Sequence, residues 1–202
     1  MLEEERFLLG KIINLFVIFL LVNSCTIVVS TAGSLVGNAT TSTRGFSGTI
    51  EDTYLMSKIV SKITLMKLSN FSNITVSVNN GNVLLAGNIE NQEKRLELIK
   101  KVWWIDGVKE VLNELEIGPR TSFSEKAEDF VFEAKIEKRL LFEPGIYTNN
   151  YSVDVVNGNV YVMGISSDIE EKTKVEKFLN NMNDIKKLIL LVDIPKNIRD
   201  GK

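Results

Sequence analysis

The sequence has no histidine and a single cysteine, Cys25, among its 202 residues. Without histidine it lacks the commonest general base and the commonest ligand of transition metals. One cysteine can form neither an intrachain disulfide nor a thiolate metal cluster. We therefore expect no metal site, no cofactor and no enzymatic activity.

The sequence also lacks an excess of basic residues. Its 24 Lys and Arg stand against 26 Asp and Glu, which gives a formal net charge of −2. Domains that bind nucleic acid usually carry a basic patch, so nucleic acid is not an expected partner. The hydrophobic content of 44% and the charged content of 25% are near the averages of globular proteins and predict a folded chain.

The apolar run near the start of the chain is too short for a membrane span. It covers only residues 12–22, IINLFVIFLLV, whereas a transmembrane helix needs about 20 apolar residues. Its length fits the hydrophobic region of a secretory signal, so residues 1–24 are predicted to be a signal peptide. The alternatives are a short uncleaved anchor and a chance apolar run.

The run ends in LVNSC at residues 21–25, which resembles the lipobox of bacterial lipoproteins. The resemblance implies a diacylglycerol group on the Cys25 sulfur and cleavage before this residue. It also implies the periplasmic face of the outer membrane, because Thr26 stands where many inner-membrane lipoproteins have aspartate. Residues 25–50 are rich in Thr, Ser, Gly and Val without a sustained period, and they are predicted to be a flexible tether.

The rest of the chain contains an internal duplication. A shift of 77 residues places residues 51–117 on residues 128–194 without a gap, and VSVNNGNVLLAG at 76–87 matches VDVVNGNVYVMG at 153–164. Self-similarity over this length predicts two copies of one structural unit. Residues 118–127 are the predicted linker, and residues 195–202 are a polar tail.

Each copy is predicted to contain two helices. Apolar residues with helical spacing form one stripe on the first helix of each copy: Leu55, Ile59 and Ile63, and then Phe132, Ile136 and Leu140. Asp52 and Asp129 are the expected N-caps of these helices, and Ser167 with Glu170 is the expected capping box of the last helix. Leu96, Ile99 and Trp103 predict a core stripe on the second helix. Trp104 is expected either to pack between the domains, which is the favoured interpretation, or to be exposed.

Three strands complete each copy. Alternating apolar residues from Ile74 to Val78 predict a half-buried strand. Asn80-Gly81 and Asn157-Gly158 predict type I′ hairpin turns, because Asn and Gly tolerate positive φ. Gly87 and Gly164 end the returning strands, where a side chain would block a close approach. The predicted α+β fold is a tandem α-β-β-α-β unit, a three-stranded sheet with two helices on one face.

The duplicated hairpin motif, Asn-Gly-x-Val-x-Leu/Val-x-Gly, resembles the BON domain of bacterial envelope proteins. Together with the lipobox, the position of Arg44 and the acidic Glu51-Asp52 pair, it resembles the family of two-BON-domain outer-membrane lipoproteins that are associated with cell division and envelope stress. The resemblance implies a non-enzymatic protein that binds anionic phospholipid and supports envelope integrity. The alternative is a periplasmic protein-binding or chaperone-like module whose partners are envelope proteins.

The resemblance places lipid contact on the first helix of the second copy. The candidate residues there are Phe130, Val131, Lys135 and Lys138, an apolar tip beside cations that suits a lipid surface. The competing surface lies on the first helix of the first copy, at Tyr54, Lys58 and Lys62. The simpler interpretation of either surface is a solvated helix face.

Overall fold

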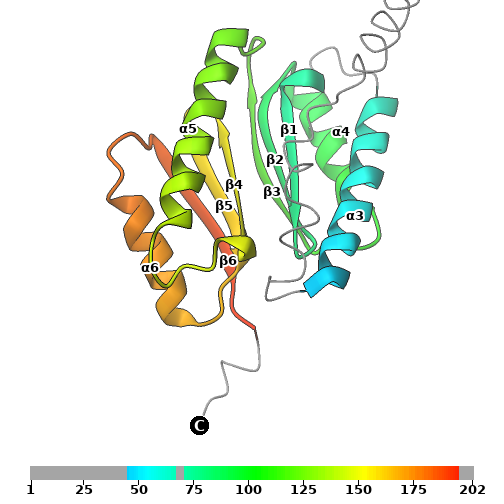
Figure 1. Ribbon diagram of the computed structural model, residues 1–202. Helices are drawn as coiled ribbons and strands as arrows, with labels where there is room; N and C mark the ends of the chain where they lie inside the picture. The colour runs from blue at the N-terminus through cyan, green and yellow to red at the C-terminus, as the bar shows by residue number, and fades with distance from the viewer. Residues whose placement is uncertain (1–44, 67–70, 196–202) are drawn as a thin grey trace, which may run out of the picture. The chain divides into compact units, whose positions relative to one another are not determined.

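The computed structural model describes residues 45–66 and 71–195 (Figure 1). The predicted signal peptide, the lipobox with Cys25, Arg44 and the tail beyond residue 195 lie outside the described residues. Among the helices of the described ranges, none is long and apolar enough to cross a membrane.

The two repeats have the predicted α-β-β-α-β order, each with one short 3₁₀ helix added before its first strand. The elements of the first repeat are α3 (Gly45–Leu65), η2 (Phe71–Asn73), β1 (Ile74–Asn79), β2 (Asn82–Ile89), α4 (Gln92–Trp103) and β3 (Glu110–Ile117). Those of the second repeat are α5 (Phe123–Leu141), η3 (Thr148–Asn150), β4 (Tyr151–Val156), β5 (Asn159–Ile165), α6 (Ile169–Asn180) and β6 (Lys187–Asp193).

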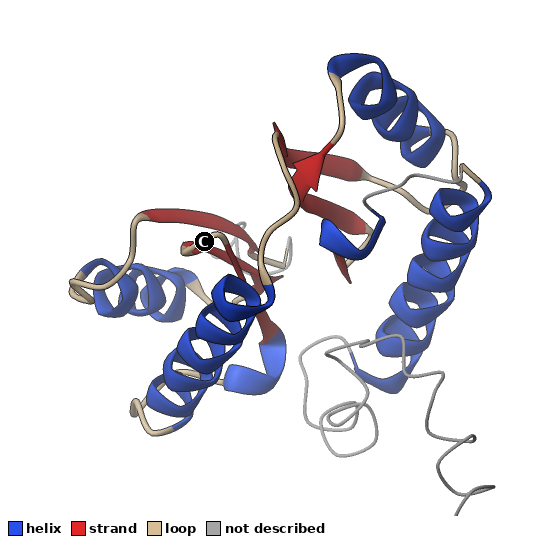
Figure 2. Ribbon diagram, turned by 90° about the horizontal axis from the view of Figure 1, so that it is seen from above, coloured by secondary structure: helices blue, strands red, loops and turns tan. Residues whose placement is uncertain are grey.

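The second strand of each repeat is the central strand of its sheet. β1 runs antiparallel to β2, with Val78 opposite Val83, and β2 runs parallel to β3. β4, β5 and β6 have the same arrangement, with Val155 opposite Val160. A parallel pair needs a crossover connection, which α4 and α6 supply. Within each repeat both helices lie on one face of the sheet, as predicted (Figures 1 and 2).

Alternate residues of the central strands contribute to different clusters. Val83 and Leu85 of β2 are buried in a core with side chains of α3 and α4, and Val160 and Val162 of β5 do the same in the second repeat. The residues between them belong to a third cluster that contains side chains of both sheets: Leu84, Ala86, Val156, Tyr161 and Met163. A unit of this size has a small core, so the shared cluster adds buried apolar area to both.

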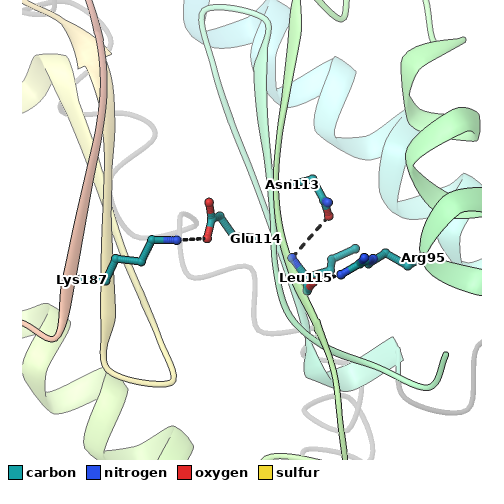
Figure 3. A network of polar contacts seen from close by, with 5 residues as sticks. All are labelled: Arg95, Asn113, Glu114, Leu115 and Lys187. Atoms are coloured by element: carbon teal, nitrogen blue, oxygen red, sulfur yellow. Dashed lines mark hydrogen bonds and ion pairs between the residues drawn. The ribbon is translucent and has the colours of Figure 1, made fainter. Parts of the chain in front are cut away.

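Polar contacts also join the repeats. Lys187 on β6 points toward Glu114 on β3, with Nζ 2.7 Å from the carboxylate (Figure 3). The Asn80 side chain in the first hairpin turn donates a 3.0 Å hydrogen bond to Asp193 at the end of β6. These contacts add an ion pair and a hydrogen bond between the repeats to the shared apolar cluster.

The leading helices begin earlier than predicted. α3 starts at Gly45, inside the segment predicted as a tether, and α5 starts at Phe123, inside the predicted linker. The N-cap of α5 is Ser122, whose hydroxyl accepts a 3.2 Å hydrogen bond from the Glu125 backbone N–H. Glu125 in turn accepts a 2.8 Å bond from the Ser122 backbone N–H. This capping box extends the helix beyond the apolar stripe that predicted it.

The prediction that Asp52 and Asp129 are helix N-caps is wrong, because both lie inside helices. Asp52 instead accepts hydrogen bonds from the backbone N–H groups of Asn80 at 2.8 Å and Gly81 at 3.0 Å. Asp129 makes the same pair of bonds in the second repeat, at 2.7 and 2.8 Å. Each aspartate therefore fixes the first helix of its repeat to the hairpin turn.

The predicted capping box of Ser167 and Glu170 is wrong by one residue. The N-cap of α6 is Asp168, whose side chain accepts a 2.8 Å hydrogen bond from the Glu171 backbone N–H. Glu171, not Glu170, reaches back to the Ser167 backbone N–H at 2.7 Å.

The predicted core stripe of α4 is also wrong in part. The buried residues of this helix are Leu98 and Val102, and Ile99 packs at the edge of the core. Leu96 is 46% exposed, Trp103 is 49% exposed and Trp104 is 87% exposed. Trp104 therefore does not pack between the domains, and Trp103 is not a core residue.

The hairpin turns have the backbone geometry of type I′ turns. φ is +54° at Asn80 and +76° at Gly81, and it is +55° at Asn157 and +75° at Gly158. Positive φ at both central residues matches the twist of the flanking strands.

The prediction that Gly87 and Gly164 end the returning strands is wrong, because β2 continues to Ile89 and β5 to Ile165. Both glycines do lie where the backbone of the preceding 3₁₀ helix comes close. A Cβ on Gly87 would lie 2.0 Å from the carbonyl oxygen of Asn73, and one on Gly164 would lie 2.4 Å from that of Asn150. No side chain fits in this space.

Candidate functional site

The outer face of α5 carries exposed apolar and cationic side chains. Val131 and Phe142 are 66% and 72% exposed, and Lys135 and Lys138 are exposed between them. A spacing of four, three and four residues places all four on one side of a helix. An apolar residue thus lies at each end of the row, with two lysines between.

This row borders a groove of about 770 Å³, which we call the α5 groove. Phe178 of α6 contributes to it from the neighbouring helix. The lining residues are Val131, Ala134, Lys135, Lys138, Arg139, Phe142, Glu143 and Phe178. Three cations and one acid make the lining locally basic, although residues 128–194 contain eight Lys and Arg against twelve Asp and Glu.

The structure brings together three of the four residues named from the sequence. Val131, Lys135 and Lys138 line the α5 groove, whereas Phe130 is not among the lining residues. Phe130 is 63% exposed, but one residue corresponds to about 100° of rotation around a helix, so it projects to a different side from Val131.

Sequence reasoning missed Arg139, Phe142 and Phe178. The helical spacing from Val131 to Phe142 was a signal that could have identified the second apolar end of the row. Phe178 gave no such signal, because only the packing of α6 beside α5 places it at the groove.

Lys135 is engaged in an ion pair within the second repeat. Its Nζ lies 2.6 Å from the carboxylate of Asp184, and both side chains are at least half exposed. The hydrogen bond from Lys135 lowers the pKa of Asp184. Lys135 also lies 5.9 Å from the centre of the Phe132 ring. An exposed ion pair of this kind contributes little to the stability of the fold. If a phosphate takes the place of Asp184 beside Lys135, the protein therefore loses little stability.

The first repeat carries a related row on α3. Tyr54, Lys58, Lys62 and Leu65 occupy the positions of Val131, Lys135, Arg139 and Phe142 under the 77-residue shift. Tyr54 is 62% and Leu65 is 76% exposed, and the Lys58 ammonium lies 4.5 Å from the centre of the Tyr54 ring. The competing surface proposed from the sequence therefore has similar chemistry.

A group of acidic side chains with raised pKa values lies on α5 and β4. Burial, with the nearby Asp154 as a further cause, raises the pKa of Glu133 to about 7, and burial raises that of Asp154 to about 6. Glu133 accepts a 3.1 Å hydrogen bond from the backbone N–H of Val155, on the edge strand β4. Perturbed carboxyl groups can mark active sites, but Asp154 is buried and neither acid lines the α5 groove.

A second hollow, of about 480 Å³, lies at the linker between the repeats. Its charged lining residues are Glu116, Arg120, Glu125, Glu128, Asp129 and Lys186. Four acids against two bases disfavour an anionic ligand there. Over residues 45–66 and 71–195, no group of three or more acidic or cysteine side chains is placed to hold a metal ion.

Comparison with known proteins identifies the same sequence family in both repeats. The BON domain, as a sequence family, matches residues 51–119 and again residues 128–194. A curated relative from Anaplasma centrale, described as an uncharacterized protein in the gshII 5′ region, is 34% identical over 144 residues, which cover 71% of this chain and 94% of the relative. The outer membrane lipoprotein DolP of Haemophilus influenzae is 25% identical over 191 residues, which cover 93% of this chain and 94% of DolP.

Among solved structures, CdsD of Chlamydia trachomatis, a structural protein of the type III secretion system, matches with a TM-score of 0.28 and 17% identity. The match covers 71% of this chain and 61% of that chain.

Proposed function

Since this chain belongs to the BON-domain family, we propose that it is a non-enzymatic outer-membrane lipoprotein that binds anionic phospholipid through the α5 groove and supports envelope integrity. The proposed anchor is a lipid on Cys25, which would place the repeats on the periplasmic face. The similarity to an outer membrane lipoprotein over almost the whole length of both chains supports this location.

The observation that carries the proposal is the composition of the α5 groove. Val131 and Phe142 are exposed apolar ends of a row whose middle is cationic. Such a row suits the boundary of a bilayer, where apolar side chains enter the acyl region and lysines meet phosphates. Charges farther away than about 8–10 Å are largely screened at physiological salt, so the local lysines and Arg139 outweigh the acidic total of the repeat.

The anchor compensates for a weak site. A domain tethered to a surface meets that surface at an effective concentration of roughly millimolar, so a modest contact suffices. The α5 groove therefore needs to orient the repeats on the membrane rather than to recruit them.

The alternative function, binding of envelope proteins by addition of a strand, is disfavoured at one sheet edge. Glu133 already accepts the hydrogen bond of the outward Val155 N–H on β4. An incoming strand would have to displace this carboxylate.

The test is flotation with vesicles, using protein that begins at Thr26 and so contains both repeats. Vesicles of phosphatidylglycerol or cardiolipin should carry the protein up the gradient, and vesicles of phosphatidylcholine alone should not. The variant Val131→Ser, Lys135→Glu, Lys138→Glu should lose binding at least tenfold while its circular dichroism and melting temperature stay unchanged. Phe130→Ser should have little effect, because Phe130 does not line the groove.

The matched control is Tyr54→Ser, Lys58→Glu, Lys62→Glu on α3, which makes nearly the same chemical change in the first repeat. It should retain binding. If this control loses binding and the α5 variant keeps it, the lipid site is on α3; if neither protein nor variant floats with any anionic vesicle, the function itself is wrong.

A further inference from the structure

The second helix of the first repeat has an exposed apolar row that its core does not use. Leu96, Lys100, Trp103 and Trp104 lie on the side of α4 away from the buried Leu98 and Val102. We call these four residues the α4 ridge. With 46%, 49% and 87% of their surfaces exposed, Leu96, Trp103 and Trp104 place large apolar groups in water, which marks an interaction surface.

The second repeat shows that the fold does not require apolar residues here. Under the 77-residue shift, the α4 ridge corresponds to Thr173, Lys177, Asn180 and Asn181 of α6, all of which are exposed. Trp104 and Asn181 are both the C-cap residues of their helices. The same position in the same fold is polar in one copy and carries two tryptophans in the other, so the tryptophans serve something other than folding.

The chemistry of the ridge fits a bilayer surface. Tryptophan has an apolar body and one N–H donor, which is why it concentrates at the boundary between headgroups and acyl chains. Lys100 adds a cation within the ridge, and Glu97 beside it is paired with Lys101 at 2.6 Å. Cys25, the proposed site of lipid attachment, is only 20 residues before Gly45. Even a fully extended chain of this length spans about 70 Å, so the first repeat stays within that distance of the membrane surface.

We propose that the α4 ridge is a second membrane contact, in which Trp103 and Trp104 lie at the interface of a lipid bilayer. This rests on the proposed function only in that the protein is anchored at a membrane; it does not require the α5 groove to bind lipid.

Tryptophan fluorescence tests this directly, because the chain has two tryptophans and both belong to the ridge. The full-length protein is reconstituted into vesicles of phosphatidylcholine and phosphatidylglycerol with or without brominated acyl chains, which quench tryptophan on contact. We expect a blue-shifted emission and at least a twofold loss of intensity with brominated lipid. Equal intensities in the two kinds of vesicle would overturn the proposal and leave a protein partner as the ridge's ligand.

A variant that carries the second repeat's residues on the α4 ridge tests the proposal by vesicle binding instead of fluorescence. The variant Leu96→Thr, Trp103→Asn, Trp104→Asn carries the residues found at the equivalent positions of the second repeat. It should therefore fold normally, which circular dichroism checks. In the chain that begins at Thr26, we expect it to bind phosphatidylglycerol vesicles at least threefold more weakly; undiminished binding would also overturn the proposal. The full-length α5 variant should keep its quenching by brominated lipid, which separates a failure of the α5 groove from a failure of the ridge.

Discussion

Asp129, on the first helix of the second repeat, binds the hairpin turn at Gly158: its Oδ1 accepts a 2.8 Å hydrogen bond from the Gly158 backbone N–H. Its other oxygen accepts a 2.7 Å bond from the neighbouring Asn157 N–H. One carboxylate thus satisfies two successive turn amides and fixes α5 relative to the sheet.

Removal of this carboxylate should destabilise the second repeat. Asp129→Ala leaves two backbone N–H groups without their acceptors, which should lower the free energy of unfolding by about 1–3 kcal/mol. Urea denaturation followed by circular dichroism measures the loss. Glu128→Ala, at the exposed preceding residue, is the control and should change stability by less than about 0.5 kcal/mol. Equal effects of the two substitutions would show that the turn does not depend on Asp129.

The buried Asp154 and the half-buried Glu133 predict a pH dependence of stability. Burial raises the pKa of Asp154 to about 6 and that of Glu133 to about 7. Between about pH 5 and 7.5 the folded protein therefore holds protons that the unfolded chain has released, so the free energy of unfolding should fall as the pH rises through this window. Urea denaturation at pH 5 and pH 7.5 should show the lower stability at pH 7.5.

Asp154→Ser tests the origin of this dependence. Asp154 receives a hydrogen bond from Ser77, the residue at the equivalent position of the first repeat, and among the described residues its Oδ2 has no partner. Serine at this position should stabilise the protein at pH 7.5, on the order of 1–3 kcal/mol, and weaken the pH dependence. Asp106→Ser, at an exposed position, should leave the dependence as it is. A variant that is less stable than the parent at pH 7.5 would contradict the assignment.

The close approach at Gly87 predicts a steric effect. A Cβ there would lie 2.0 Å from the Asn73 carbonyl oxygen, and φ is +108°, so Gly87→Ala should destabilise the first repeat by about 1–3 kcal/mol. Gly118→Ala is the matched control, because its Cβ would lie 3.7 Å from the nearest atom. Melting temperatures that fall equally in the two variants would be inconsistent with a specific clash.

The ion pair between Lys135 and Asp184 predicts a gain of function. Asp184→Asn removes the competing carboxylate 2.6 Å from the Lys135 ammonium, so binding to phosphatidylglycerol vesicles should strengthen about threefold, equivalent to a change of less than about 1 kcal/mol. Glu176→Gln makes the same change in net charge at an exposed position of α6. If both variants bind more tightly by the same factor, net charge rather than the release of Lys135 is responsible.

The proposed anchor predicts a processing defect. Cys25→Ser removes the sulfur that would carry the lipid, so the chain should accumulate as an unprocessed precursor and should not reach the outer membrane. Fractionation of cells and immunoblotting measure both. Mature-sized protein in the outer membrane would contradict lipid attachment at Cys25.

By itself, the sequence determined the duplication, the order of the elements and the hairpin turns. These are local properties: a 77-residue shift aligns the copies without a gap, the apolar period distinguishes helix from strand, and Asn-Gly at 80–81 and 157–158 tolerates the positive φ that the turn requires. The apolar stripes of the first helices were likewise predicted correctly. Leu55, Ile59 and Ile63 occupy one side of the helix, and no polar residue interrupts their spacing.

The tertiary structure alone decided what the ambiguous residues do. Aspartate near a helix start has the same local signature whether it caps the helix or binds a distant turn, and only the position of the hairpin beside α5 shows that Asp129 does the latter. Leu96, Leu98, Val102 and Trp103 are all apolar, and α4 can bury only one side of its surface. Which side it buries depends on its rotation against the sheet, and that rotation leaves Trp103 and Trp104 exposed.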